Sequence, residues 1–296
     1  DKYLKNKNNR LHQQLNFIYQ HTGDSSYPVI KTDNRNSFLI KGKIVDPDKI
    51  GLAYVNIGIS NKNLGTVSQR DGSFQIKIYT EFVSDSLTIS MAGYQSRTIA
   101  ISKLIHETKP LSISLKEKFT ELNEVVITKR TLPVKILGNT TTSNFISVGL
   151  PLKFLGSEVG VKINLGKNPV LLRKFSFNVS GNRLDTAVFR MNIYNIEKGL
   201  PSDNILQKNI LVHVGKQTGL YTIDLTDYKL KMKGEIFLSL EWIEGSSTNL
   251  EPGAIFLSAG FLNSSTWHRT TSQGEWKKAP GLGVGLNLEV QKLPVL

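Results

Sequence analysis

The sequence predicts an all-β protein made of two consecutive sandwiches. Its 296 residues exceed the length of one ordinary domain and suffice for two that each bury a core. Hydrophobic residues make up 39% of the chain, and Val, Ile, Thr, Phe and Tyr recur in short runs between many of the 24 glycines. Short β-prone runs separated by turn residues are typical of strands rather than helices. No apolar run approaches the roughly 18 residues of a transmembrane helix, so no transmembrane span is expected.

The first segment, residues 1–37, is a polar leader rich in Lys, Asn and Gln. Leu11, Leu15 and Ile18 recur at the i, i+4 and i+7 spacing of one helix face. Two interpretations stay open: a poorly ordered leader, or a short amphipathic helix whose apolar stripe needs a partner surface.

Residues 38–117 read as a small sandwich of about seven short strands. Phe74, Ile76 and Ile78 alternate with polar residues, as in a strand that buries one face. Asp71 and Gly72 stand just before this strand, and an Asp-Gly pair favours the positive φ of a tight hairpin. The pattern therefore predicts strands joined by tight turns.

Several motifs in this segment carry a family resemblance. In order they are Gly42-Lys43-Ile44-Val45-Asp46, Leu52-Ala53-Tyr54-Val55, Gly65-Thr66 with Asp71-Gly72-Ser73-Phe74, and Gly93-Tyr94. Together they resemble the carboxypeptidase-regulatory-like (transthyretin-like) domain found on exported proteins of Bacteroidota. The resemblance implies a seven-stranded transthyretin-like sandwich that serves as a structural or interaction module without catalytic residues.

Residues 118–144 are predicted to form a connector and linker. The run from Leu122 to Thr128 is similar to the segment that joins such a sandwich to the plug of TonB-dependent outer-membrane receptors. The 168 residues after Thr128 are too few for a plug and a receptor barrel. An exported accessory protein is therefore expected, not a receptor. Pro133 and Gly138, together with a Thr run, favour an interdomain linker from Thr131 to Asn144.

Residues 145–296 predict a second, larger sandwich that is jelly-roll-like. Phe175, Phe177 and Val179 alternate with polar residues, and this alternation recurs in later segments. Eight or more strands are therefore expected. The stretch from Phe189 to Tyr194 and the following Gly199-Leu200-Pro201 resemble the C-terminal β-sandwiches of uncharacterised exported Bacteroidota proteins.

The sequence carries no catalytic, cofactor or metal motif, so no enzyme and no cofactor are predicted. The chain has no cysteine, which excludes disulfides, thiolate nucleophiles and cysteine-ligated zinc. Its five histidines are isolated from other strong ligands, and neither a nucleophile elbow nor a phosphate-binding loop is present. Two carboxylate pairs, Asp224 with Asp227 and Glu241 with Glu244, could in principle run glycoside hydrolysis. We interpret them as solvated charges.

Tryptophans near the C-terminus are the first candidate binding residues. Trp267, His268 and Arg269 stand on one side of a polar loop and Trp276 on the other, while Trp242 ends an earlier strand. Exposed tryptophans beside hydrogen-bonding and cationic groups suit sugar stacking or a protein hot spot. The alternative is aromatic packing at the rim of the sandwich.

Three lysines are the second candidate. Lys229, Lys231 and Lys233 alternate with apolar residues, so a strand here would present them on one face. That face could meet lipopolysaccharide phosphates or an acidic subunit, or could simply be solvated. The net charge of +13 is spread along the chain and no nucleic-acid motif accompanies it, so nucleic acid is not an expected partner.

Two short motifs resemble O-glycosylation acceptors of Bacteroidota envelopes: Asp85-Ser86-Leu87 and Asp185-Thr186-Ala187. Both motifs could instead be turn-to-strand junctions. The family resemblance implies an exported protein of the periplasm or outer-membrane surface. The expected function is non-enzymatic binding or scaffolding, as an accessory subunit of an outer-membrane assembly with outer-membrane or periplasmic proteins as partners. The alternative is a glycan-binding module that uses the tryptophans of the second sandwich.

Overall fold

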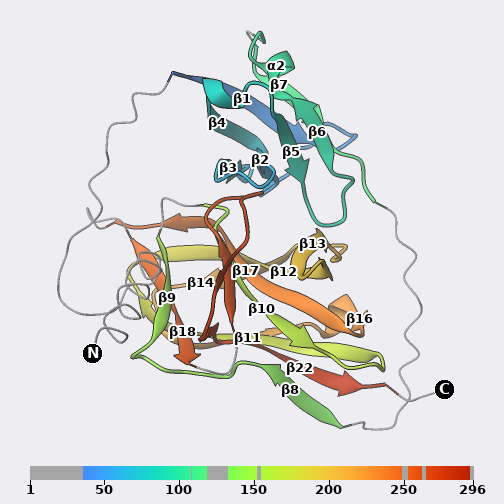
Figure 1. The fold of residues 1–296 in the computed structure, drawn as a ribbon, viewed down its shortest axis with the longest axis vertical. Coiled ribbons are helices and arrows are strands. Elements are labelled where there is room, and N and C mark those ends of the chain that lie inside the picture. The colour runs from blue at the N-terminus through green and yellow to red at the C-terminus, as the bar shows by residue number, and fades with distance from the viewer. Residues whose placement is uncertain are drawn as a thin grey trace, which may run out of the picture.

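A computed structural model describes residues 36–107, 109–118, 133–151, 155–248, 253–261 and 265–293. These residues form two β-sandwiches, one above the other in Figure 1, which confirms the predicted all-β class. The predicted leader helix at Leu11–Ile18 and the connector from Leu122 to Thr128 lie outside the described residues.

The first sandwich consists of a three-stranded and a four-stranded sheet, and thus has the predicted seven strands. The three-stranded sheet has the order β4-β1-β7, with β1 (Ser37–Val45), β4 (Ser73–Tyr79) and β7 (Leu111–Ser114). The other has the order β3-β2-β5-β6, with β2 (Asn56–Ile59), β3 (Gly65–Val67), β5 (Ser86–Ser90) and β6 (Arg97–Ala100). A 3-10 turn, η2 (Thr80–Phe82), and a short helix, α2 (Ile101–Leu104), complete it.

The core of this sandwich follows the alternation in the sequence. Phe74, Ile76 and Ile78 of β4 are buried, and the polar residues between them are exposed. Gly72 has a φ of +85° in a tight turn before β4, as predicted, but this turn does not form the predicted hairpin, because β3 and β4 lie in different sheets and β4 pairs with β1. Strands β1 and β4 pair antiparallel, whereas β1 and β7 pair parallel.

The second sandwich packs a seven-stranded sheet against an eight-stranded one. We call the seven-stranded sheet the interface sheet, because it faces the first sandwich. Its main order is β13-β12-β17-β10-β19-β20, and β14 also pairs with β12. Its strands are β10 (Glu158–Asn164), β12 (Thr186–Glu197), β13 (Leu200–Asn204), β14 (Ile210–Val214), β17 (Glu235–Ser246), β19 (Thr266–Arg269) and β20 (Lys277–Ala279).

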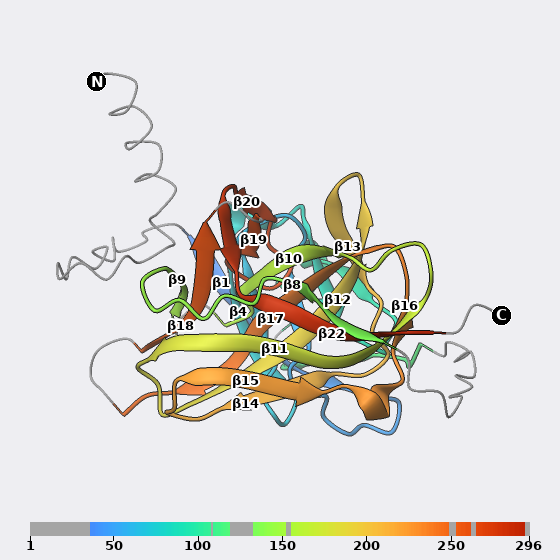
Figure 2. The same ribbon diagram turned by 90° about the horizontal axis from the view of Figure 1, so that it is seen from below.

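The eight-stranded sheet, called the distal sheet, lies in front in Figure 2. Its main order is β21-β18-β11-β22-β8; β15 and β16 also pair with β11, and β9 with β18. Its strands are β8 (Val134–Gly138), β9 (Ser147–Pro151), β11 (Val170–Asn182), β15 (Gly219–Asp224), β16 (Lys231–Met232), β18 (Ala254–Phe261), β21 (Leu282–Val284) and β22 (Leu286–Lys292). A 3-10 turn, η3 (Thr226–Tyr228), follows β15.

The core of the second sandwich lies between its two sheets. Phe189 and Leu240 of the interface sheet pack in the same hydrophobic cluster as Phe177 and Leu288 of the distal sheet. The chain passes between the sheets from β10 to β11, from β11 to β12 and from β17 to β18, as expected of a jelly-roll-like sandwich.

Part of the predicted linker is a strand. Val134–Gly138 is β8, which pairs antiparallel with β22 at the edge of the distal sheet. Pro133 and Gly138 flank this strand instead of marking a flexible segment, because Pro can precede a strand and Gly138 ends it with a φ of +105°. The interpretation of 131–144 as linker is therefore wrong for these five residues.

Candidate functional site at the domain interface

A row of four charged side chains crosses the face of the interface sheet that points to the first sandwich. Arg190, Glu241, Glu158 and Arg269 occupy directly opposed positions on the adjacent strands β12, β17, β10 and β19. We call them the charged row. Arg190 Nη2 lies 2.7 Å from Glu241 Oε2, and Arg269 Nη2 lies 2.6 Å from Glu158 Oε2. Each glutamate therefore has its own arginine. All four residues are buried, and the protein interior screens their charges only weakly.

Neighbouring side chains supply further hydrogen bonds to the carboxylates. Asn192 Nδ2 donates to Glu158 Oε1 at 2.9 Å and to Glu241 Oε2 at 2.8 Å. The Tyr194 hydroxyl also donates to Glu158, at 3.0 Å. Burial acts to raise the pKa of Glu241, but the charges of Arg190 and Arg269 outweigh it and hold the pKa below its ordinary value. Glu241 therefore stays ionised inside the protein.

The first sandwich completes the hydrogen bonds of Arg190. Arg190 Nη1 donates to the backbone oxygen of Tyr54 at 2.6 Å, and Nη2 donates to Asn56 Oδ1 at 2.6 Å. Ser272 Oγ donates to the same Asn56 oxygen at 3.0 Å. One guanidinium thus neutralises a glutamate of the second sandwich and binds acceptors of the first. Separating the sandwiches would remove two of its acceptors.

Tyr54 has an unusual backbone at this contact. Its φ is +61°, a left-handed conformation that is unfavourable for a bulky residue. The carbonyl oxygen that Arg190 binds and the hydroxyl that reaches Glu244 both belong to this residue. The two contacts hold Tyr54 from both ends, so the docked second sandwich stabilises the strained conformation.

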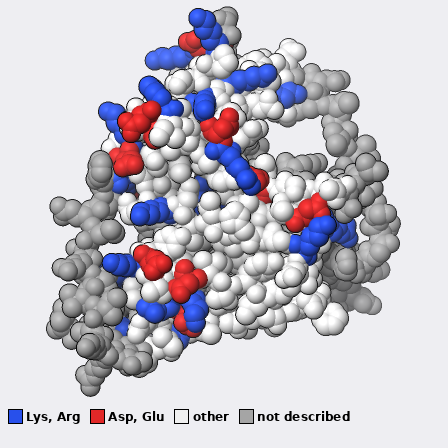
Figure 3. Space-filling view, turned by 180° about the vertical axis from the view of Figure 1, so that it is seen from behind, with Lys and Arg blue, Asp and Glu red and all other residues white. Residues whose placement is uncertain are grey.

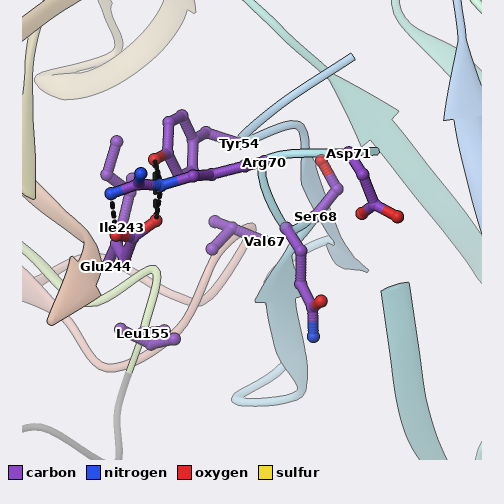
Figure 4. A pocket seen from close by; sticks show the side chains of 9 residues that line it. Tyr54, Val67, Ser68, Arg70, Asp71, Leu155, Ile243 and Glu244 are labelled. Carbon is purple, nitrogen blue, oxygen red and sulfur yellow. Dashed lines mark hydrogen bonds and ion pairs between the residues drawn. The ribbon is translucent and has the colours of Figure 1, made fainter. Parts of the chain in front are cut away.

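A second, more exposed contact closes the interface near the surface, as Figure 4 shows. The Tyr54 hydroxyl donates to Glu244 Oε2 at 2.7 Å, and Arg70 Nε donates to the same oxygen at 2.9 Å. Arg70 Nη2 lies 2.5 Å from Glu244 Oε1, which makes the pair bidentate. The hydrogen bond from Arg70 is the main reason that the pKa of Glu244 is lowered. Burial and then the hydrogen bond with Glu244 raise the pKa of the Tyr54 hydroxyl.

A cleft of about 510 Å³ opens beside this contact. Its apolar lining comes from Val67 in the first sandwich and from Leu155 and Ile243 in the second, and Figure 4 shows Leu155 below the Arg70 and Glu244 pair and Val67 to the right of it. The volume lies within the range of ligand sites, which often form between domains.

A loop of the second sandwich docks on strands β2 and β3. Gln273 Nε2 donates to Ser90 Oγ at 2.7 Å, and Asn61 N donates to the Gln273 carbonyl at 2.9 Å. The Ser272 carbonyl approaches two glycines so closely that an added Cβ would lie 2.5 Å from it at Gly58 and 2.0 Å at Gly65. These glycines are needed because the loop packs directly on the backbone.

Trp242 is not a binding residue, contrary to the prediction. It is fully buried in the core between the two sheets, where its ring lies 5.7 Å from that of Phe189. Its position on β17 points inward because side chains alternate along a strand.

The structure brings Trp276 and Arg269 together but gives them packing roles. The Trp276 ring makes edge contacts with Tyr194 at 6.1 Å and Phe237 at 4.8 Å, and the Arg269 guanidinium lies over it at 4.9 Å. Arg269 is buried in the charged row, which contradicts its prediction as an exposed cationic group. The alternative of aromatic packing at the rim therefore describes Trp276 better than sugar stacking.

Trp267 and His268 are half-buried neighbours on β19. Lys162 of β10 and Lys278 of β20 lie 5.3 Å and 5.9 Å from the centre of the Trp267 ring. Since these strands flank β19 on opposite sides, lysines approach the ring from both. Burial and then the charge of Lys277 lower the pKa of His268.

The three candidate lysines are exposed, as predicted, but no strand carries them all. Lys229 ends η3 with a left-handed φ of +50°, and β16 contains only Lys231 and Met232. Lys233 follows β16. The expectation of one three-lysine strand is wrong, although the exposed and half-buried positions do alternate.

The carboxylate pairs considered in the sequence do not face each other as an acid and a base. Glu241 binds Arg190 in the interior, while Glu244 binds Arg70 near the surface. Asp224 accepts a hydrogen bond from the Thr226 amide in a local turn. Across the residues that the structure describes, no group of three or more His, Asp or Glu side chains could hold a metal ion.

Sequence reasoning missed Arg190 and Glu158 and did not recognise the role of Glu241. A signal was present, because Arg190 and Glu241 each stand within strands whose other residues are mostly apolar. Their pairing depends on the register of strands far apart in the chain.

The surface shows charges of both signs. On the face drawn in Figure 3, Lys and Arg side chains are scattered and interspersed with Asp and Glu instead of forming one patch. Among the described residues, no helix is long and apolar enough to cross a membrane.

Comparison with known proteins bears mainly on the first sandwich. Residues 40–127 match a family model described as CarboxypepD_reg-like domain, which supports the family resemblance of this part of the chain. No curated protein matches the chain.

Solved structures show weak similarities. The cysteine protease and lectin-like domains of Cwp84, a surface layer associated protein of Clostridium difficile, align with a TM-score of 0.40 and 8% identity over 84% of this chain. The chain spans 62% of that structure. The clostridial cysteine protease Cwp84 after propeptide cleavage aligns with a TM-score of 0.39 and 8% sequence identity. That alignment covers 92% of this chain and 75% of the clostridial one. A structure of infectious bursal disease virus, Gt strain, aligns with a TM-score of 0.22 and 10% sequence identity. That alignment covers 87% of this chain and 64% of the viral one. At these TM-scores the similarities carry no argument about function.

Proposed function

We propose that this protein is a non-enzymatic binding or scaffolding protein of the cell envelope, and an accessory subunit of an outer-membrane assembly. The carboxypeptidase-regulatory-like match of residues 40–127 supports a binding or scaffolding module. Export to the periplasm or outer-membrane surface is part of the same proposal.

The observation that carries the proposal is the polar interface between the sandwiches. Arg190 binds both halves of the molecule, and all four residues of the charged row are buried in the docked arrangement. A module that holds two sandwiches in one orientation suits a scaffold, because rigid presentation lowers the entropy lost on binding.

The carboxylates favour a structural role over a catalytic one. Glu158 and Glu241 are adjacent in register but fully buried, and each is paired with an arginine. A catalytic pair must be reached by substrate, and these two groups are closed off from solvent and bound to arginines.

Mild extraction of native envelopes, followed by affinity purification of the full chain, tests the proposal. We expect stoichiometric recovery with outer-membrane or periplasmic proteins. We also expect recovery to fall for Gly65→Ala, which places a Cβ against the Ser272 carbonyl, and to be unchanged for Gly215→Ala, which has open space around it. Recovery as a free monomer in repeated mild extractions would contradict the proposal.

A glycan is the second candidate, now restricted to Trp267. Its ring lies between Lys162 and Lys278. A phosphorylated sugar, as in lipopolysaccharide, therefore suits this place better than a neutral sugar. Titration with phosphorylated and dephosphorylated oligosaccharide should show binding of the first, lost in Trp267→Ala. Equal binding by Trp267→Ala would remove this candidate.

A further inference from the structure

We propose that the interdomain cleft binds an extended segment of a partner protein and seats one aliphatic side chain of it against the half-buried Leu155, beside the buried Val67 and Ile243. This inference rests on the proposed binding function and names the site and the chemistry of the partner. Four observations lead to it: the apolar lining, the open strand edge, the charged rim and the continuity with the interface between the sandwiches.

The apolar lining continues an interface that already exists. Tyr54, Val67, Val188 and Ile243 form a buried hydrophobic cluster between the sandwiches, and partly buried Leu155 packs against it. Three of the cluster residues also line the cleft. The cleft is therefore the margin of an interface whose core is already dry and ordered, so an aliphatic side chain placed there would extend it.

The strand beside the cleft has a free edge. Strand β3 is the outermost strand of its sheet and ends at Val67. The next residue, Ser68, uses its N–H and C=O toward Val55 and Tyr54 on the β2 side. Because these directions alternate along an antiparallel strand, the N–H and C=O of Val67 point away from β2. Among the described residues, the Val67 carbonyl accepts only a 3.5 Å bond from the Thr66 hydroxyl. An extended peptide can pair with such an edge.

The rim of the cleft disfavours an anionic ligand. A free anion would compete with Glu244, which already binds Arg70 in a bidentate pair, and Asp71 adds a second negative charge. A polar rim around an aliphatic floor is typical of a protein hot spot.

Phage-displayed random peptides offer the direct test. Peptides are selected on the full chain and measured on Leu155→Arg, which places a charged side chain in the cleft, and on Leu220→Arg, a control on β15 that is 63% exposed. We expect selected peptides to contain an aliphatic residue and to bind Leu155→Arg about ten-fold more weakly or worse. Binding to Leu220→Arg should equal that of the original chain.

A second measurement keeps the proposal testable if Leu155→Arg does not fold. In methyl NMR spectra of the unaltered protein, a selected peptide should shift the resonances of Val67, Leu155 and Ile243 and leave Leu220 unchanged. Three outcomes would overturn the proposal: no enriched peptide, no shift of the cleft methyls, or shifts caused by neutral oligosaccharides but not by peptides.

The failure of this inference is distinguishable from the failure of the proposed function. Peptides that bind the original chain and Leu155→Arg equally would leave a protein-binding function in place and move it to another surface. Dimerisation at high concentration that Leu155→Arg abolishes would identify a second copy as the occupant, against the proposal of a different partner.

Discussion

The two faces of the interface sheet bury their side chains by different means. The inner face packs Phe189, Leu240 and Trp242 against the distal sheet in a large hydrophobic core. The outer face buries Arg190 and Glu241 at neighbouring positions of the same strands, where ion pairs and hydrogen bonds lie beside a small hydrophobic cluster that includes Val188 and Ile243. One sheet therefore belongs to a sandwich core on one side and to a domain interface on the other.

The difference shows what each face can specify. An apolar face tolerates any packing of about the right volume, whereas a buried charge requires a particular partner. Arg190 must meet the Tyr54 carbonyl and the Asn56 side chain to complete its hydrogen bonds. The outer face thus fixes how the first sandwich sits on the second, although buried ion pairs contribute little net stability once desolvation is counted.

The largest effect is expected from breaking the charged row. Arg190→Met leaves Glu241 buried without its nearest cation and removes a donor from Tyr54 and Asn56. The expected loss in the free energy of unfolding is about 3–5 kcal/mol. Urea denaturation of the full chain measures it. The double variant Arg190→Met with Glu241→Gln should recover part of the loss, and a double variant worse than the single would contradict the account.

An inner-face variant of similar cost sharpens the comparison. Phe189→Ala should cost about 3–5 kcal/mol by leaving a cavity in the core of the second sandwich. Hydrogen exchange of β12 backbone amides should rise in both variants, but Tyr54 and Asn56 should lose protection more in Arg190→Met than in Phe189→Ala. Equal loss at these two residues would mean that the faces do not differ in role.

A backbone variant tests the docking of the Ser272 loop. Gly65→Ala puts a Cβ 2.0 Å from the Ser272 carbonyl and should cost about 1–3 kcal/mol. Gly215→Ala, with nothing within 4 Å of the added Cβ, is the matched control and should be near neutral. Thermal denaturation of both variants measures the difference. Equal midpoints would show that the Ser272 loop moves away from the added Cβ without loss of stability.

Removing one hydroxyl should have a smaller effect. Tyr54→Phe keeps the ring and the left-handed backbone but deletes the hydrogen bond to Glu244, at an expected cost of about 1 kcal/mol. Urea denaturation should show this shift without a change in slope. A cost as large as that of Arg190→Met would mean that the surface contact, not the charged row, dominates the interface.

Acid should weaken the interface. The pKa values of Glu241 and Glu244 in the folded protein lie below the ordinary 4.5. Their stabilisation is therefore complete above pH 4.5 and is lost as the pH falls through the lowered values. Thermal midpoints measured across this range should drop on the acid side, and the drop should be shallower in Glu244→Gln. A thermal midpoint that stays unchanged in acid would contradict the lowered pKa values of Glu241 and Glu244.

Local patterns predicted much of the fold. The alternation of Phe74, Ile76 and Ile78 and the tight turn at Asp71 and Gly72 are local features, so neighbouring residues suffice to predict them. Strand β8 was not predicted, because the five residues Val134–Gly138 form a strand only through their pairing with β22.

The candidate site was harder to predict because register decides it. Trp242 and Glu241 are adjacent in sequence, yet one lies in the core and the other in the charged row. Nothing local says which face the first sandwich covers. Arg190 and Glu158 become partners of the same interface only through the pairing of β12, β17 and β10.

The central claim is that the charged row makes the two sandwiches unfold as one unit. Native-state hydrogen exchange in increasing urea tests it most directly, by following the most protected amides of β1 in the first sandwich and β11 in the second. We predict that their opening free energies converge in the original chain and separate in Arg190→Met. Strands that open independently in the original chain, or that still converge in Arg190→Met, would contradict the claim.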